Sequence, residues 1–289
     1  MISTDLVFDV TTAASLGEPV QIAATLHRPS TDVPRGLVFA IHGGGYTRAY
    51  WNPPFADESY SFARWFTDRG HAVVAIDMLG MGESSRPEPE SRLSGALIAA
   101  AHAAALEQAR GMIGAAVPIT GVGHSMGGMM VIAQAADHPA FDRVAVLGWA
   151  NEPMMLGDTD VATLQAGLIP SGYLATPRAP MRKLFYAADV PEALILSDEA
   201  AASTTPATMG RDALTPGIVH PAATRIAVPV LVVQSVVDTS PAPERELAYF
   251  SNSPSVELQI VENAAHCQNF ASTRQQHWDA LHDWIVRTS

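Results

Sequence analysis

The sequence predicts an α/β fold in which helices cover both faces of a mostly parallel central sheet, with a helical lid inserted late in the chain. Strand-like and helix-like segments alternate along most of the 289 residues. The strand-like segments are apolar and rich in β-branched residues, which is typical of parallel strands buried on both faces. This alternation stops at residue 152 and resumes after residue 222. We therefore expect core segments at 1–151 and 223–289, with a lid at 152–222.

The first half of the chain supplies most of the expected sheet. Strands are expected at 20–29 (VQIAATLHRP), 36–42 (GLVFAIH), 71–77 (HAVVAID), 117–124 (VPITGVGH) and 143–150 (RVAVLGWA). Between them, "ESYSFARWFTDRG" places Phe62, Trp65 and Phe66 on one helical face before Gly70, a residue type that often follows a helix end. Further helices are expected at 91–110 and 125–136.

After the insertion, strand-like and helix-like segments alternate again. Strands are expected at 228–238 (VPVLVVQSVVD) and 255–262 (SVELQIVE), with a helix near 244–250 between them. A final helix places Trp278, Leu281 and Ile285 on one side, which predicts that it packs on the sheet.

The insertion differs from the rest of the chain in its proline content and in the length of its predicted elements. It holds eight of the 21 prolines and short helix-like pieces such as "VATLQAGLI" and "MRKLFYAAD", with no convincing strand. Structureless loops of this length are uncommon in compact domains, so a lid is a better interpretation than a long surface excursion. Its aromatic and methionine side chains suggest a closed apolar pocket. Arg178, Arg182 and Lys183 are expected on a solvated face rather than as anchors of a substrate carboxylate.

Charge and cysteine content narrow the function classes. Seventeen basic and 29 acidic residues give a net charge of -12, which disfavours binding to nucleic acid or an anionic membrane and leaves a small molecule as the expected partner. The one cysteine, Cys267, permits no intrachain disulfide, and "MISTDLVFDV" lacks the features of a secretory signal. No apolar run approaches the ~20 residues that span a bilayer. We expect a soluble cytoplasmic protein.

The stretch "GHSMG" at 123–127 fits the pattern G-x-S-x-G where a strand should pass into a helix. In that turn the serine adopts a strained backbone that lifts its hydroxyl above the sheet, and glycines flank it because side chains would collide with the neighbouring strand and helix. Ser125 is therefore the candidate nucleophile. An ordinary glycine turn with an N-capping serine is the alternative.

The same glycines also approximate a dinucleotide-binding loop. That motif needs a third glycine where Met126 stands, and an acidic residue closing the next strand, which "RVAVLGWA" lacks. This interpretation is therefore weak.

A nucleophilic serine needs a base, and the base needs an orienting carboxylate. Asp238 follows one expected strand, and His266 follows the last one, so both fit the chain order Ser, Asp, His. Glu152, just past the strand at 143–150, is the alternative acid. His277 and His282 also follow Asp238, but they fall in the final amphipathic helix and are expected at its surface.

Acyl transfer also needs donors for the developing oxyanion. The stretch "HGGGY" at 42–46 follows an expected strand, and its glycines would let backbone N–H groups face the pocket. The backbone amides of Gly44 and Met126 are the predicted donors, with Gly45 as an additional or alternative one.

These motifs together resemble the α/β-hydrolase superfamily over essentially the whole chain: "HGGGY", "DMLGMGES" at 77–84, "GHSMGG", Asp238 and His266 match in order and spacing. The resemblance implies a serine hydrolase with an inserted lid. Relatives that act as haloalkane dehalogenases or epoxide hydrolases carry aspartate at the nucleophile position, where this chain has Ser125. The loop "DMLGMGES" is interpreted as structural.

The expected activity is hydrolysis of a small or medium, largely apolar carboxylic ester or lactone, with no metal and no cofactor. Two other functions remain open. One is a carbon–carbon bond hydrolase or a cofactor-free oxidoreductive relative that uses the same triad. The other is a ligand receptor with little turnover. Fold analogy fixes the chemistry better than the substrate.

Overall fold

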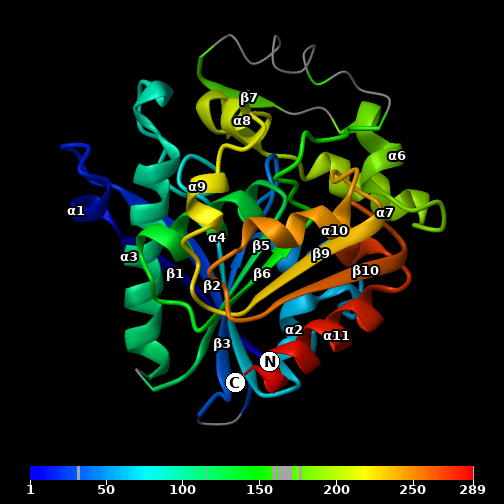
Figure 1. The fold of residues 1–289 in the computed structure, drawn as a ribbon. Helices are drawn as coiled ribbons and strands as arrows, with labels where there is room; N and C mark the ends of the chain where they lie inside the picture. The colour runs from blue at the N-terminus through cyan, green and yellow to red at the C-terminus, as the bar shows by residue number, and fades with distance from the viewer. Residues whose placement is uncertain (31–32, 115, 158–160, 162–170, 176–177, 289) are drawn as a thin grey trace.

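The computed structural model of the protein describes residues 1–30, 33–114, 116–157, 161, 171–175 and 178–288. An eight-stranded sheet with the order β1-β2-β4-β3-β5-β6-β9-β10 forms its centre (Figure 1). The last six strands in this order, β4, β3, β5, β6, β9 and β10, run parallel to one another. Strand β2 pairs antiparallel with both β1 and β4. The bounds are β1 Ile2–Asp9, β2 Gln21–Arg28, β3 Gly36–Ile41, β4 His71–Ile76, β5 Ile119–His124, β6 Arg143–Leu147, β9 Val230–Val237 and β10 Val256–Ala265.

The predicted fold class is confirmed, and each strand expected in the core is present. The first strand, β1, was not predicted. It lies at the edge of the sheet, pairs with β2 alone, and is exposed at most of its positions. An exposed edge strand lacks the continuous apolar run that identifies a buried one, so its sequence gave a weak pattern.

Two hydrophobic cores lie on the two faces of the sheet, as the alternation of side chains along β3 illustrates. Leu37 and Phe39 join a core shared with α1, α3 and α4, whereas Val38 and Ala40 join a core shared with α2 and α11. The helices are α1 Thr11–Ala14, α2 Phe62–Thr67, α3 Gly95–Ile113, α4 Met126–Asp137, α10 Pro243–Glu246 and α11 Arg274–Arg287. Short 3₁₀ turns are η1 Arg48–Trp51, η2 Glu58–Tyr60, η3 Glu90–Arg92, η5 Leu247–Tyr249 and η6 Gln268–Phe270.

Capping serines set two of the helix starts. The Ser61 hydroxyl accepts a hydrogen bond from Arg64 N at 2.9 Å where α2 begins. The Ser94 hydroxyl accepts one from Leu97 N at 3.2 Å, so α3 begins at Gly95 rather than at the expected residue 91. The 3₁₀ turn η3 occupies the intervening residues.

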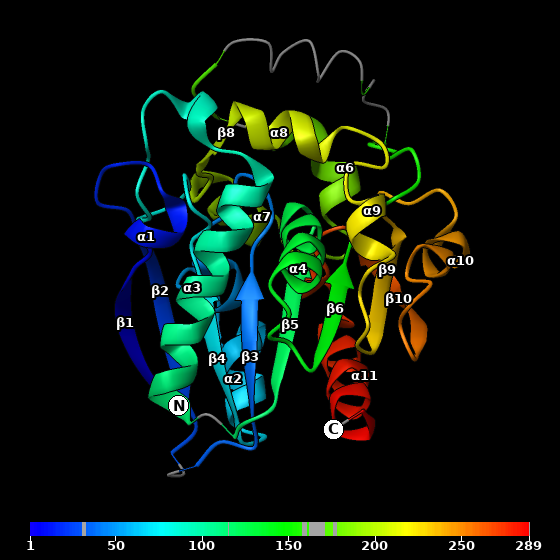
Figure 2. The ribbon, with the colours of Figure 1, turned by 60° about the vertical axis from the view of Figure 1, so that its left-hand side comes forward.

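The insertion between β6 and β9 lies over the carboxyl ends of the parallel strands (Figures 1 and 2). It contains β7 Tyr173–Ala175, η4 Ala179–Met181, α6 Arg182–Phe185, α7 Glu192–Ala200, β8 Thr204–Pro206, α8 Ala207–Ala213 and α9 His220–Ala223. The expectation of no strand was wrong, because β7 and β8 form a two-stranded antiparallel sheet. Strands of three residues are too short for a period of two to be recognised. The expected helical piece "VATLQAGLI" falls, apart from Val161, outside the described residues.

None of the helices in the described part of the chain is both long enough and apolar enough to cross a membrane.

Candidate active site

The pairing register gathers the sequence-predicted site residues at one edge of the sheet. Val237 at the end of β9 pairs with Ala265 at the end of β10, so Asp238 and His266 follow a matched pair of residues. His124, the last residue of β5, pairs with Leu147 of β6, and Ser125 follows it. Because carboxyl ends of parallel strands meet at one edge, these side chains lie near one another beneath the insertion.

Ser125 occupies a strained turn between β5 and α4. Its backbone has φ +55° and ψ -121°, a left-handed value that non-glycine residues rarely adopt. Its N–H donates to Leu147 O at 2.7 Å, which holds the turn against β6. Ser125 is partly exposed, whereas the residues from Gly121 to His124 and from Met126 to Met130 are buried. Ser125 is therefore the one residue from Gly121 to Met130 that solvent reaches appreciably.

The two flanking glycines allow this turn to pack. A Cβ at Gly123 would lie 2.1 Å from Gly127 O, and a Cβ at Gly127 would lie 2.2 Å from Ile41 O. These obstacles are backbone atoms, which cannot move aside as a flexible side chain can. The collisions expected from the sequence are thus present on both sides of Ser125.

We expect Gly127→Ala to lower the free energy of unfolding by about 3 kcal/mol or more, because the added methyl overlaps the β3 backbone. Gly111→Ala is the matched control, since Gly111 lies in α3 with nothing within 4 Å of an added Cβ. It should stabilise the protein by about 0.5–1 kcal/mol through helix propensity. Urea unfolding of both variants makes the comparison, and equal stabilities would contradict the close packing of the turn.

His266 and Asp238 form a buried hydrogen-bonded pair. Their side chains are 4% and 1% exposed, and His266 Nδ1 lies 2.6 Å from Asp238 Oδ1. The carboxylate also accepts hydrogen bonds from Ser235 N and Thr239 N, both at 2.8 Å, and from Gln268 Nε2 at 3.1 Å. Four donors therefore fix the carboxylate, which in turn engages Nδ1 of the imidazole and leaves the other ring nitrogen, Nε2, outside this pair.

Within the described residues, no hydrogen bond joins the Ser125 hydroxyl to the His266 ring. Catalytic hydrogen bonds are often long before substrate binds. His124 holds the histidine loop, the segment after β10 that carries His266. Its Nε2–H donates to His266 O at 2.8 Å, and its ring stacks on Tyr50. Burial lowers the pKa of His124 well below its ordinary value, so the ring is neutral. His124 occupies a position of the G-x-S-x-G pattern that any residue can fill, so the motif did not predict this contact.

Glu152, the alternative acid, has other partners. Its Oε1 accepts a hydrogen bond from the Tyr249 hydroxyl at 2.8 Å and lies 3.2 Å from Arg245 Nη2. Among the described residues, the carboxylate that pairs with the His266 ring is that of Asp238.

The expected oxyanion donors lie beside Ser125. A Cβ at Gly44 would be 3.0 Å from Met126 Cε, so these two residues are in contact. Met126 is the first residue of α4, where a helix leaves its N–H groups without intrahelical partners. The Gly45 amide, the alternative donor, is already engaged, because it donates to the Thr205 hydroxyl at 2.8 Å. Thr205 belongs to the insertion, and nothing in its sequence surroundings pointed to this contact.

Two expectations about side chains outside the site were wrong. His277 is 1% exposed rather than at the surface, because it faces β10 and its Nδ1 lies 3.2 Å from Gln259 Oε1. His282 is partly exposed. Arg178 is 4% exposed rather than solvated, because its charge pairs with Asp198 at 2.7 Å. Arg182 is partly exposed and pairs with glutamates of the insertion.

In the loop "DMLGMGES", hydrogen bonds and an ion pair of Asp77 hold the backbone in place. The Asp77 carboxylate pairs with the Arg48 guanidinium and accepts hydrogen bonds from Arg48 N at 2.6 Å and Glu83 N at 2.8 Å. A Cβ at Gly82 would lie 2.3 Å from the Asp77 carboxyl carbon, so the loop closes tightly around this group. Asp77 therefore ties this loop to the segment that follows "HGGGY".

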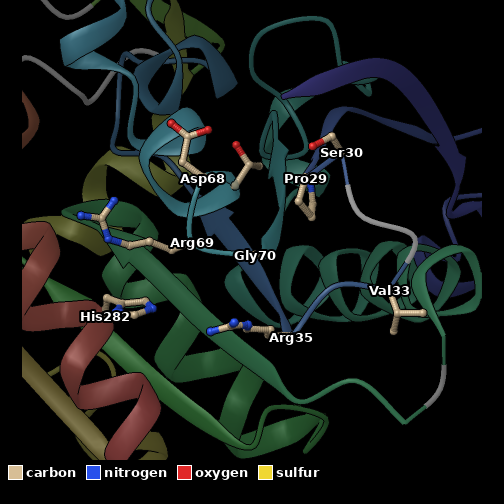
Figure 3. Close-up of a pocket in the computed structure, with 9 residues that line it drawn as sticks. Pro29, Ser30, Val33, Arg35, Asp68, Arg69, Gly70 and His282 are labelled. Carbon is tan, nitrogen blue, oxygen red and sulfur yellow. The ribbon is translucent and has the colours of Figure 1, made fainter.

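A surface pocket lies at the other end of the sheet (Figure 3). It is lined by Arg35 and Gly70, which precede β3 and β4, by His282 near the end of α11, and by Pro29, Ser30, Val33, Thr67, Asp68 and Arg69. Amino ends of parallel strands face away from the edge that carries Ser125, so this pocket is separate from the candidate site. Within the described residues, no group of three or more His, Cys, Asp and Glu side chains is arranged to hold a metal ion.

Comparison with known proteins gives a family match. The profile of the family described as "Alpha/beta hydrolase family" matches residues 37–282. No curated protein sequence matches.

Many solved structures resemble the chain. A soluble variant of monoglyceride lipase from Saccharomyces cerevisiae has a TM-score of 0.74 at 15% identity, covering 93% of this chain and 92% of that one. A thermophilic esterase from Thermogutta terrifontis has a TM-score of 0.71 at 14% identity, with 99% of both chains covered. A bromoperoxidase from Bacillus anthracis has a TM-score of 0.63 at 18% identity, also with 99% of both covered. Identities this low establish the shared fold alone.

Proposed function

The chain belongs to the alpha/beta hydrolase family, and from this premise we propose that it is a serine hydrolase that cleaves a carboxylic ester or lactone through an acyl-enzyme on Ser125. One observation carries the proposal: a partly exposed serine on a strained turn shares a sheet edge with a buried histidine–aspartate pair. Backbone strain costs free energy and is concentrated at functional sites, so an ordinary glycine turn does not account for the strained serine near that pair.

In the proposed reaction, His266 Nε2 accepts the Ser125 proton as the serine oxygen attacks the carbonyl carbon. The Gly44 and Met126 amides stabilise the oxyanion of the tetrahedral intermediate, and Asp238 stabilises the imidazolium. The intermediate collapses as His266 returns the proton to the leaving alcohol, and the acyl-enzyme forms. His266 then takes a proton from water, whose oxygen attacks the acyl carbon, and returns it to Ser125 as the carboxylic acid leaves.

The surroundings of the site favour a largely apolar substrate. The Phe185 ring of the insertion lies with its centroid 5.4 Å from that of His266. Among the similar structures, the monoglyceride lipase and the esterase are named for acting on esters, which agrees with this substrate class.

Covalent labelling tests the proposed nucleophile. A fluorophosphonate should add one adduct per chain, located on the peptide that contains Ser125, and the adduct should be absent from Ser125→Ala. Labelling of that variant at the wild-type rate would refute the assignment. A panel of esters of increasing chain length, lactones and carbon–carbon bond substrates then identifies the bond cleaved. Turnover confined to the last group would replace ester hydrolysis with carbon–carbon cleavage.

The insertion, residues 152–222, is proposed to act as a lid that selects substrates. Phe185→Ala should change the ratio of kcat/KM for a bulky ester to that for a short ester by about tenfold, because the ring packs over His266. Leu184→Ala, one residue earlier and also buried, is the control. Equal changes for both esters in Phe185→Ala would show that the ring does not contribute to selection.

A further inference from the structure

Gly45 is held at both of its polar backbone atoms by the insertion. Its N–H donates to Thr205 Oγ1 at 2.8 Å. Its carbonyl accepts hydrogen bonds from Ser203 N at 2.8 Å and Arg178 Nη2 at 2.6 Å. These three hydrogen bonds, called the grip below, join the insertion to the loop "HGGGY" that follows β3. They are made by the residue next to Gly44, the proposed oxyanion donor.

This grip bears on the direction of the Gly44 amide. The Gly44 carbonyl and the Gly45 N–H belong to one rigid peptide plane, so holding that N–H fixes the plane on the carboxyl side of the Gly44 Cα. The Gly44 N–H belongs to the preceding plane, whose Gly43 carbonyl accepts hydrogen bonds from His42 Nδ1 at 2.7 Å and Tyr46 N at 3.2 Å. The two planes meet at the Gly44 Cα, where glycine offers little steric resistance to rotation, so a contact on the second plane is needed to limit that rotation. The Thr205 hydroxyl is close enough to provide it, since it lies 3.8 Å from where a Gly44 Cβ would be.

The groups that make the grip are themselves fixed. Thr205 is 4% exposed and lies on β8. Arg178 is paired with Asp198 at 2.7 Å, and its guanidinium carbon lies 3.7 Å from the centre of the Tyr46 ring. The Tyr46 hydroxyl donates to the same Asp198 carboxylate at 2.9 Å. Buried charged and polar groups with several partners resist displacement, so the insertion offers the loop a rigid support.

We propose that Thr205 is a positioning residue: by accepting the Gly45 N–H it limits rotation about Gly44 and so keeps the Gly44 N–H directed toward the oxyanion. The assignment rests on the proposed function. Thr205 acts through Gly45 and makes no contact with the reacting atoms, so its removal affects the transition state more than the binding of substrate. The insertion therefore contributes to the chemistry of the core as well as to access.

The test is Thr205→Val, which keeps the shape and removes the acceptor. We expect kcat and the rate constant of Ser125 phosphonylation to fall on the order of tenfold, less than the hundredfold or more that follows loss of an oxyanion donor. KM for a short ester should stay within about threefold. Thr205→Ser keeps the hydroxyl and should restore both rates. A role confined to folding would lower the melting temperature without this split between kcat and KM.

Thr204→Val is the matched control. It makes the same change one residue earlier, where the buried hydroxyl has no hydrogen-bond partner among the described residues, and it should react at the wild-type rate. The proposal is overturned if Thr205→Val reacts as fast as Thr204→Val, or if Thr205→Ser fails to restore the rates. Thr205→Cys, a weak acceptor, decides the same comparison if the valine variant does not fold. Absence of any wild-type adduct on Ser125 would instead refute the proposed function, and this assignment with it.

Discussion

Ser125→Ala is expected to lower kcat on the best ester of the panel on the order of 10⁵-fold, leaving only the activity that binding and the oxyanion donors support without a nucleophile. The serine packs against β6 through its backbone N–H, which alanine retains. The strained φ of +55° is also no worse for alanine than for serine. Folding should therefore be unaffected, and steady-state kinetics with a circular dichroism spectrum separate the two effects.

Ser197→Ala serves as the control for this variant. Its hydroxyl donates to Ala193 O one turn earlier in α7, so its loss removes only a contact within that helix and should leave kcat unchanged. A Ser125→Ala protein that keeps more than about a tenth of wild-type kcat would rule out the acyl-enzyme mechanism. In that case the conserved fold would carry a different function, such as binding of a ligand.

The placement of Ser125, Asp238 and His266 could be predicted because each residue stands at or shortly after the end of an expected strand. Parallel strands end at a common edge, so the local pattern was enough to predict that these residues lie at the same edge of the sheet. The choice between Asp238 and Glu152 was harder, since both follow strands that end at this edge. It depends on the register of β9 against β10, which sets Asp238 beside His266. That register is a tertiary property, and the strand pattern alone does not contain it.

The contacts made by the insertion could not be predicted for a related reason. The hydrogen bond from Gly45 N to Thr205 joins residues 160 positions apart. Neither residue belongs to a long periodic segment. The burial of Arg178 was missed because a charged residue normally lies in solvent, and its buried partner Asp198 could not be foreseen from sequence. Pairs of this kind become visible only when the fold brings distant segments together.

The insertion also supports the histidine loop. His266 N donates to Leu184 O at 2.9 Å, and Cys267 N donates to Phe185 O at 3.0 Å. Cys267 is buried, and burial raises the pKa of its thiol. One segment of the insertion thus carries the Phe185 ring and fixes the loop of the proposed base. Substitutions there should be interpreted with both effects in mind.

Asp238→Asn should lower kcat by about 10⁴-fold while the protein remains folded. Both carboxylate oxygens accept two hydrogen bonds: Oδ1 from His266 and Thr239, and Oδ2 from Ser235 and Gln268. An asparagine amide therefore turns its NH₂ group toward donors in either orientation. The imidazole loses the partner that selects its tautomer, and the imidazolium loses the negative charge that stabilises it. Steady-state kinetics and thermal unfolding of the variant measure these effects separately.

Glu152→Gln is the matched comparison, since it neutralises the other carboxylate that follows a strand at this edge. Glu152 bonds Tyr249 and lies near Arg245, and its Arg245 partner is 70% exposed, so the pair contributes little. We expect kcat to stay within about threefold of wild type, because the partners of Glu152 are Tyr249 and Arg245, so its loss removes no interaction specific to the transition state. The reverse result, near-normal turnover in Asp238→Asn and collapse in Glu152→Gln, would make Glu152 the acid. It would also require His266 to exchange its 2.6 Å partner during the reaction.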